Sequence, residues 1–266
     1  MSKYLAVFKI SFAQEFVYRL NFIMWRVRNV LQIFLIFFLW DSIFADPGRV
    51  VFGYDRAKIL TYVFGLLIVR SIVLSTRTID VPGDISNGDL TNYLLKPVNY
   101  FKYWFTRDLS SKALNLIFAA LEAMLIYFLL RPPFFFQQNP AILLLFFLAV
   151  FLAVVLYFLM IFIFSTFPFW YPEQAWGSIF LLFIFTEFLA GGAFPLDILP
   201  PLAQKVIYST PFPYLLFMPL QIYLGKISFL VGVKAVLIAS LWVGILALIL
   251  KLLWSFGLKA YRAEGR

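Results

Sequence analysis

The sequence contains no cysteine and no histidine. Without cysteine, the chain has no disulfide bonds and no thiolate ligands for a metal ion. Without histidine, it lacks the commonest protein ligand for metals and the side chain whose charge changes near neutral pH. A metal centre built on imidazole or thiolate is therefore excluded, and so is a histidine proton relay.

Charged residues are scarce as well: they make up 13% of the 266 residues, whereas 63% are hydrophobic. A soluble domain carries roughly 25% charged residues because its surface faces water. The chain has too few charges for such a surface, and apolar stretches of about 20 residues, the length that crosses a bilayer, recur along it. The sequence therefore predicts an all-α membrane protein with several transmembrane helices.

A helical pattern precedes the first apolar run. Apolar residues recur on one face at steps of seven, four, four and three: Leu5, Phe12, Phe16, Leu20 and Ile23. Ser11, Glu15, Arg19 and Arg26 lie toward the other side, where Glu15 and Arg19 are spaced to pair. We expect residues 1–24 to form an amphipathic leader on the membrane surface, retained rather than cleaved as a signal peptide. The alternative is a cytoplasmic extension of the first span.

Six spans are predicted after this leader, at residues 25–44, 57–75, 113–130, 142–167, 175–190 and 233–256. The net charge of +9 does not indicate a nucleic-acid partner, because the basic residues gather beside the apolar runs, where lipid headgroups attract them. They concentrate in the N-terminal segment, in the second connection (76–112) and in the tail, the last of which holds Lys259, Arg262 and Arg266. The positive-inside rule therefore predicts cytoplasmic termini in the plasma or inner membrane.

The second connection predicts a short helix between two breaks. Gly83 and Gly88 interrupt the chain, Asp89 is placed to cap a helix over residues 90–96, and Pro97 ends it. Such a helix would expose Leu90, Tyr93 and Leu94 for docking into a groove of another protein, or it would be an amphipathic turn on the membrane surface. The GDISNG stretch has the glycine spacing of a phosphate-binding loop but lacks its lysine, so we expect no ATP to bind there.

The connection between the fifth and sixth spans, residues 191–232, is apolar but broken by proline. It opens with Gly191, Gly192, Phe194 and Pro195, and Pro200 follows. Exposed backbone cannot face lipid, so such a segment must be buried in protein or line a cavity. We expect a re-entrant hairpin at the outer face, with a pair of interfacial helices as the alternative.

Two carboxylates fall inside predicted spans: Glu122 near the middle of the third, and Glu187 in the outer half of the fifth. A charge at this depth is costly and is by default a functional candidate. Glu187 would belong to a gate near the outer hairpin, or both residues would only form interhelical hydrogen bonds. No metal-ligand cluster or activated nucleophile accompanies them, so we expect no enzyme activity in this chain.

Two segments resemble the type-2 ATP-binding cassette exporter permeases. Residues 85–100, ISNGDLTNYLLKPVNY, are similar to the cytoplasmic coupling segment of that family, and residues 191–225 are similar to its outer segment before the last span. With the leader and six spans, the resemblance covers nearly the whole chain. It assigns the coupling contact to Gly88, Asp89, Leu90, Leu94, Lys96 and Pro97, and the exit region to Phe194, Pro195 and Pro200.

The resemblance further implies that two permeases, identical or related, pair, and that each docks onto a cytoplasmic ATPase subunit that binds the ATP and Mg. This chain would then hold no cofactor of its own. The competing functions are a substrate-capture subunit of an ATP-driven importer, which needs a preformed polar pocket, a proton-coupled transporter that uses Glu122 or Glu187, and a membrane-embedded transferase or protease. An aromatic content of 21% suits a lipid, an amphipathic drug or a lipid-linked polymer as cargo, but it suits a lipid-facing surface equally well.

Overall fold

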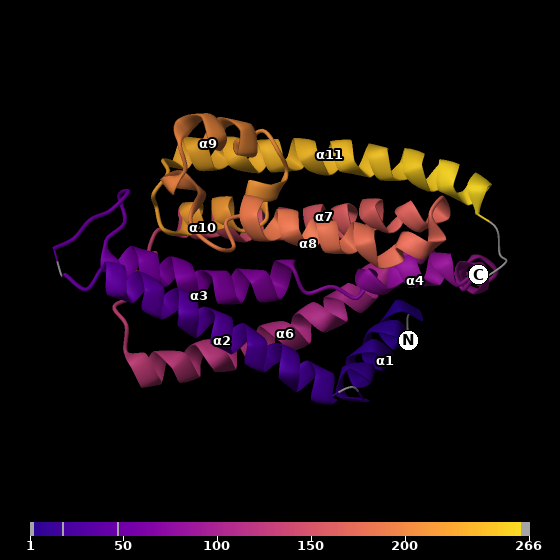
Figure 1. Ribbon diagram of the computed structural model, residues 1–266, viewed down its shortest axis with the longest axis horizontal. Helices are drawn as coiled ribbons and strands as arrows, with labels where there is room; N and C mark the ends of the chain where they lie inside the picture. Colours follow the sequence, from indigo (N-terminus) through magenta and orange to yellow (C-terminus); the bar gives the residue numbers. More distant parts are fainter. Residues whose placement is uncertain (1–2, 18, 47, 262–266) are drawn as a thin grey trace.

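The computed structural model describes residues 3–17, 19–46 and 48–261, and within these ranges every regular element is a helix (Figure 1). The α-helices are α1 Lys3–Val17, α2 Arg19–Ile43, α3 Arg56–Val73, α4 Val81–Ser86, α5 Leu90–Leu94, α6 Tyr100–Leu130, α7 Pro140–Ser165, α8 Ala175–Leu189, α9 Pro201–Tyr208, α10 Phe217–Tyr223 and α11 Phe229–Ala260. The expectation of an all-α membrane protein is therefore confirmed. The predicted tail residues Arg262 and Arg266 lie outside the described residues, as do residues 1, 2, 18 and 47.

Three elements are long and apolar enough to cross a membrane on their own: Tyr100–Leu130, Pro140–Phe169 and Phe229–Ala260. A fourth crossing is possible if Arg56–Val73 and Thr78–Ser86, which meet at an angle of 56°, count as one broken span. The described parts of α2 and α8 do not meet that test. The chain crosses the membrane several times, and the number six stays a prediction.

The long helices run roughly along one axis in two groups (Figure 1). α2, α3 and α6 form one group, and α7, α8 and α11 form the other, with α3 packed against α7 between them. The connections 44–55, 131–139 and 190–228 lie at one end of the molecule, which we name the α9 end. The start of α1, the connection 74–99 and the last turns of α11 lie at the opposite end, the α4 end. The start of α1 and the end of α11 thus lie at the same end of the molecule, which is what an even number of crossings requires.

The core lies where α3 and α7 meet. α3 buries apolar side chains along most of its length, including Ile59, Leu60 and Val73, and α7 buries Leu156 and Ile161. The outer faces of α6 and α11 instead expose large apolar side chains: Leu121, Leu125, Phe128, Leu237, Leu241 and Leu248. A water-facing surface does not carry so much apolar area, so lipid covers these faces.

The leader differs from the expectation at its C-terminal end. α1 ends at Val17 and α2 begins at Arg19, so residues 19–24 belong to the first long helix rather than to the leader. Leu5 is exposed, whereas Glu15 is buried against the protein and forms an ion pair with Arg77. The predicted pair of Glu15 with Arg19 lies outside the described side chains. The side chains of Phe16, Arg19 and Leu20 lie outside those that the structure describes. The polar side of the leader thus faces the protein.

The segment 191–232 contains one surface helix and one buried helix. α9 has no buried residue, whereas α10 buries Phe217, Leu220 and Gln221 and packs against α7 and α3. The burial of α10 satisfies the requirement that a proline-broken apolar segment be covered by protein. Its depth in the bilayer stays a prediction.

Candidate functional site

The connection between α3 and α6 folds into a small body anchored by Leu90. This side chain is fully buried in an apolar cluster with Val81 and Ile85 of α4, Trp104 of α6 and Trp254 of α11. The prediction that Leu90 is exposed is therefore wrong. On a five-residue helix, exposure depends on contacts with distant α6 and α11, which the local pattern does not contain.

The helix boundaries in this connection also differ from the prediction. Gly83 lies inside α4 instead of breaking the chain, whereas Gly88 makes a true break with a φ of +83° that favours glycine. The Asp89 side chain does not cap α5; its Oδ1 accepts from Asn92 Nδ2 at 3.5 Å. α5 ends at Leu94, short of the predicted Lys96.

The tip of the connection is apolar and basic. Leu94 is 49% exposed and Leu95 is 81% exposed, and Lys96 and Pro97 beside them are exposed too. Tyr93 is half-buried and contacts the rings of Tyr100 and Tyr103. We name residues 94–97 the tip. The sequence pattern missed Leu95, because in the predicted helix 90–96 it does not share the face of Leu90, Tyr93 and Leu94, whereas in the structure it is the C-terminal cap of α5 and is exposed.

A polar cluster joins this connection to α3 and α6, and we name it the root: it consists of residues 76–78 together with Asp108 and Lys112 of α6. Asp108 of α6 accepts from the backbone nitrogens of Arg77 and Thr78 at 2.6 and 2.9 Å and from the Thr76 hydroxyl at 2.8 Å. Lys112, one turn further along α6, donates to the carbonyl oxygens of Val73 and Ser75 at 3.0 and 2.5 Å. The end of α3 is thereby fixed to α6. Sequence reasoning treated Lys112 only as a basic residue and missed Asp108, although the two are spaced one helical turn apart.

Asp84 adds a titratable group to the same body, in the connection between the predicted second and third spans. Burial raises the pKa of Asp84 to about 6, and a hydrogen bond of 2.9 Å from the Tyr100 hydroxyl partly offsets this rise. The charge of the connection therefore changes within the range of pH that cells experience.

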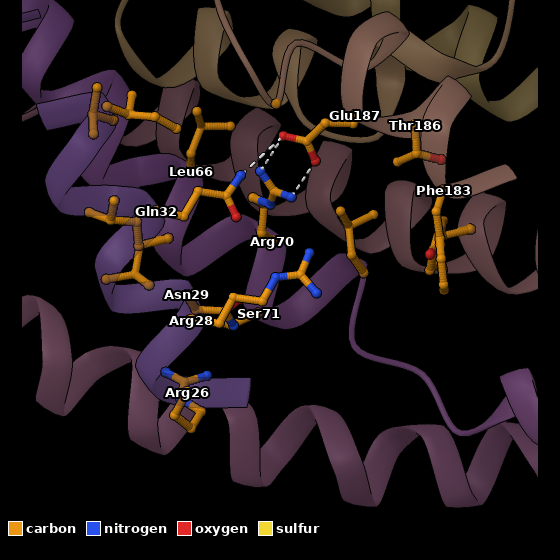
Figure 2. Close-up of a pocket in the computed structure, with 17 residues that line it drawn as sticks. Arg26, Arg28, Asn29, Gln32, Leu66, Arg70, Ser71, Phe183, Thr186 and Glu187 are labelled. Atoms are coloured by element: carbon orange, nitrogen blue, oxygen red, sulfur yellow. Dashed lines mark hydrogen bonds and ion pairs between the residues drawn. The ribbon is translucent and has the colours of Figure 1, made fainter. Parts of the chain in front are cut away.

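A cavity of about 230 Å³ opens between α2, α3, α7 and α8 (Figure 2). Three arginines line it, namely Arg26, Arg28 and Arg70, together with the polar residues Asn29, Gln32, Ser71, Thr186 and Glu187. Arg70 donates to the two oxygens of Glu187 at 3.1 and 2.6 Å, and Gln32 donates to the same carboxylate at 3.3 Å. The spans thus contain more polar groups in one place than their composition suggested.

Glu122 lies behind this cavity rather than in it. It forms a bidentate pair with Arg26, whose guanidinium also donates to Asn115 Oδ1 at 3.3 Å. Each intramembrane carboxylate therefore has an arginine partner on another helix. The pair with Arg26 agrees with the alternative in which Glu122 only joins two helices. Glu187, in contrast, lies in the wall of the cavity.

The two glycines after α8 shape one end of the cavity. Gly191 has a φ of +82°, and its carbonyl oxygen accepts from the Tyr62 hydroxyl at 2.7 Å. A Cβ on Gly192 would lie 3.2 Å from a guanidinium nitrogen of Arg70. Of the residues assigned to the outer gate, Gly192 and Glu187 line the cavity. Phe194, Pro195 and Pro200 follow outside it, where Pro195 precedes the 3₁₀ turn Leu196–Ile198 and Pro200 precedes α9.

Asp197 joins three segments at the α9 end. Its carboxylate accepts from the Tyr54 hydroxyl at 3.1 Å, from Gln221 Nε2 at 3.2 Å and from Lys226 Nζ at 2.8 Å. Lys226 also lies 3.2 Å from the centre of the Tyr54 ring. The connection between α2 and α3 is thus tied to the segment that holds α10. Within the described ranges, no group of three or more Asp or Glu is placed to hold a metal ion.

Comparison with protein families gives one match that covers most of the chain. The model of a family described as "ABC-2 family transporter protein" matches residues 30–265. A comparison with curated protein sequences finds no significant match.

Proposed function

The chain belongs to the ABC-2 transporter family, so it is a membrane permease of an ATP-binding cassette transporter, and we propose that this transporter is an exporter. In this proposal the chain forms a translocation path with a second permease. A separate cytoplasmic ATPase subunit binds ATP and Mg and supplies the energy. The chain itself catalyses no reaction.

The observation that carries the proposal is the tip. Leu94 and Leu95 expose apolar surface next to Lys96, on a body that Leu90 fixes to α6 and α11. An exposed apolar pair on a rigid support is a typical docking element, because its partner gains buried area without ordering a flexible loop. We expect the tip to enter a groove of the ATPase subunit.

The distribution of charge supports placing this end in the cytoplasm. Eight basic residues of the described chain belong to segments at the α4 end: Lys3, Lys9, Arg77, Lys96, Lys102, Arg107, Lys112 and Lys259. The connections at the α9 end and the adjoining first turn of α3 hold six, namely Arg49, Arg56, Lys58, Arg131, Lys205 and Lys226, so the larger share of basic residues lies at the α4 end. Positively charged segments stay on the cytoplasmic side of plasma and bacterial inner membranes. The tip would therefore face the compartment that contains ATP.

The root provides a route from the tip to the spans. Asp108 binds the chain at residues 76–78, Lys112 binds the end of α3, and Arg77 pairs with Glu15 of α1. A movement of the tip would therefore displace α3, α6 and α1 together. Arg70, which faces the cavity, lies on α3 close to this root.

The second permease would meet the faces of α2 and α8 beside the cavity opening. These faces expose large apolar side chains, among them Leu35 and Leu39 on α2 and Phe180 and Ile184 on α8. The segment 191–232 lies beyond the cavity, toward the α9 end, where an exporter must release its cargo. In this proposal Asp197 keeps that end closed until ATP drives the change.

The experiment is purification of the tagged chain in mild detergent from its own host, followed by mass spectrometry and an assay of ATP hydrolysis. We expect a co-purifying subunit with a phosphate-binding loop, and its loss in the double variant Leu94→Asp/Leu95→Asp. The matched control is Leu202→Asp/Val206→Asp, which places the same charges on two exposed residues of α9 at the opposite end. That control should retain the ATPase.

Three results would contradict the proposal. If both double variants retain the ATPase equally, the tip is not the docking element. If the intact chain carries no ATPase and its transport follows a proton gradient, the chain works as a proton-coupled transporter, and Glu122 and Glu187, each of which forms an ion pair with an arginine, become the residues to test. Uptake rather than release in sealed vesicles would favour the importer alternative.

A further inference from the structure

The cavity between α2, α3, α7 and α8 has an excess of positive charge. Among its lining residues, three arginines face one glutamate. Glu187 pairs with Arg70, and Glu122 reaches Arg26 from outside the lining. Arg28 forms no hydrogen bond or ion pair with any residue that the structure describes, and in Figure 2 its side chain extends between Asn29 and Ser71. One full positive charge in the cavity is therefore left without a carboxylate partner.

One other polar group in the wall, the Thr186 hydroxyl, is buried and also lacks a hydrogen-bond partner among the described atoms. Asn29, Gln32 and Ser71 supply further amide and hydroxyl groups around the same space. A cationic side chain surrounded by hydrogen-bond donors at membrane depth is costly unless an anion or water satisfies it. Such a wall selects a ligand that is rich in acceptor oxygens and negatively charged.

The remaining wall is apolar, and it continues away from the cavity along α2. Ile33, Ile36, Val63 and Leu66 line the inner side. Leu35 and Leu39 follow Arg28 and Gln32 at steps of three and four residues, so they continue the same face toward the α9 end, and both are exposed. A lipid in the cytoplasmic leaflet has its polar and apolar parts in the same order along the membrane normal: its charged head lies near the cytoplasm, and its chains extend toward the middle of the bilayer.

The volume sets a limit on what can be enclosed. Pockets that hold a whole drug-sized molecule measure about 300–1,000 Å³, whereas this cavity measures about 230 Å³. It has room for a compact head with one phosphate or carboxylate group, and the acyl chains must remain outside, between α2 and α8. The site is therefore open toward lipid and toward the proposed second permease.

We infer that this cavity binds the anionic head of an amphiphile from the cytoplasmic leaflet, with Arg28 as the main contact to its phosphate or carboxylate. The inference rests on the proposed function, because it names the class of cargo that the permease would take up. Arg70 and Arg26 position the wall through their pairs with Glu187 and Glu122. Thr186, Gln32 and Asn29 supply hydrogen bonds to the head.

The test measures binding to the purified full-length chain by native mass spectrometry. The probes are dioctanoyl phosphatidic acid, uncharged dioctanoylglycerol and inorganic phosphate. We expect one phosphatidic acid per chain, no comparable binding of dioctanoylglycerol, and binding of phosphate that is weaker by at least about tenfold. Arg28→Gln should weaken the binding of phosphatidic acid by about tenfold or more, which is the effect of losing one charged hydrogen bond.

Two further variants make the result specific. Arg28→Lys keeps the charge and should stay within about threefold of the unmodified chain, whereas Lys9→Gln, which removes an exposed charge from α1 at the same end of the molecule, should bind as tightly as the unmodified chain. Because Arg28 is exposed and has no partner, its replacement should not impair folding.

Three results would overturn the inference: an Arg28→Gln variant that binds phosphatidic acid normally, dioctanoylglycerol that binds equally well, or phosphate alone that binds as tightly as the amphiphile. The last would indicate a site for free anions. The unmodified chain is assayed in parallel for a co-purifying ATPase. If the ATPase co-purifies but phosphatidic acid does not bind, only the proposed binding site is refuted. If phosphatidic acid binds normally but no ATPase co-purifies, only the proposed transporter is refuted.

Discussion

Arg70 and Glu187 meet side by side although 117 residues separate them, and their closest atoms lie 2.6 Å apart. Arg70 stands near the end of α3 that joins the root, and Glu187 stands near the end of α8 that joins the glycine turn. Through this one pair, the element that the root holds is attached to the element that precedes the segment 191–232. The first prediction concerns the strength of this attachment.

Replacing Glu187 with Gln should destabilise the protein by about 1–3 kcal/mol. The change leaves the Arg70 guanidinium partly buried without its carboxylate, and removal of one partner of a buried pair is more costly than removal of both. The Arg70→Gln/Glu187→Gln double variant should therefore be more stable than Glu187→Gln alone. Thermal unfolding in detergent, followed by size-exclusion chromatography, measures both. Glu173→Gln, which neutralises an exposed carboxylate before α8, is the control, and an equal loss there would contradict the prediction.

Leu90 and Leu95 should behave in opposite ways when each is replaced by Ala. Leu90→Ala should cost about 2–4 kcal/mol of stability, because it opens a cavity beneath Trp104 and Trp254. Leu95→Ala should change stability by less than about 0.5 kcal/mol, because its side chain contacts solvent. Unfolding temperatures of the two variants, measured in the same detergent, check this difference. Equal effects would mean that the tip packs against the chain itself.

The protein should lose stability as the pH rises from about 4 to 6, and Asp84 should account for part of the loss. The pKa of Asp84 is raised to about 6 in the folded protein, so the folded state keeps a proton that the unfolded chain has already released in this range. Stability from this residue is therefore greatest below the window and lowest above it. Asp84→Asn should be more stable than the unmodified protein at pH 7.5 by about 1–2 kcal/mol, with solvent screening taken into account.

The measurement is the difference in unfolding temperature between Asp84→Asn and the unmodified protein from pH 4 to 7.5. The difference should grow up to about pH 6 and then stay constant. Asp46→Asn neutralises an exposed carboxylate in the connection between α2 and α3 and should give no such profile. A difference that is independent of pH would show that Asp84 acts through packing rather than through its charge.

Gly191→Ala should destabilise the protein by about 1–3 kcal/mol. The residue has a φ of +82°, which alanine adopts only with strain, and the new Cβ would lie 2.8 Å from the Tyr62 hydroxyl. Gly244→Ala is the control: Gly244 lies inside α11 with no neighbouring atom within 4 Å of a new Cβ, and alanine favours helices. The control should be neutral or slightly stabilising in the same thermal assay, and a similar loss in both variants would contradict the role assigned to the turn.

The sequence predicted the long helices because each depends mainly on its own apolar run. The predicted spans 142–167 and 175–190 lie within two residues of α7 and α8 at both ends. The start of α6 was missed: charged residues such as Arg107 and Asp108 hid its first turns, which the structure shows as helix from Tyr100. Asp108 accepts hydrogen bonds from residues 76–78 of the preceding connection, and Arg107 lies over the rings of Tyr103 and Trp104. The contacts of Asp108 with a segment about 30 residues away are not recorded in any local pattern.

The candidate site was predictable only in pieces. Glu122 and Glu187 were recognised because a carboxylate is unusual in an apolar run, but their partners Arg26 and Arg70 lie 96 and 117 residues away. Arg28 was counted with the basic residues that set orientation, which is a correct reading of its charge but contains no information about the cavity. Whether a basic side chain binds a loop or lines a pocket depends on how two helices that are distant in sequence pack against each other.

α8 has 15 residues and so spans about 22 Å, which is less than the roughly 30 Å of a bilayer's hydrocarbon core. If α8 forms the predicted fifth span, the glycine turn and the buried α10 would complete the crossing in place of more helix. A long helix adapts to a thicker bilayer by tilting, but α8 has no spare length for that. A mismatch between the length of α8 and the thickness of the bilayer would therefore act on the irregular turn at residues 190–192. The conformation of this turn, and with it the activity of the permease, would then depend on the lipid composition of the host membrane.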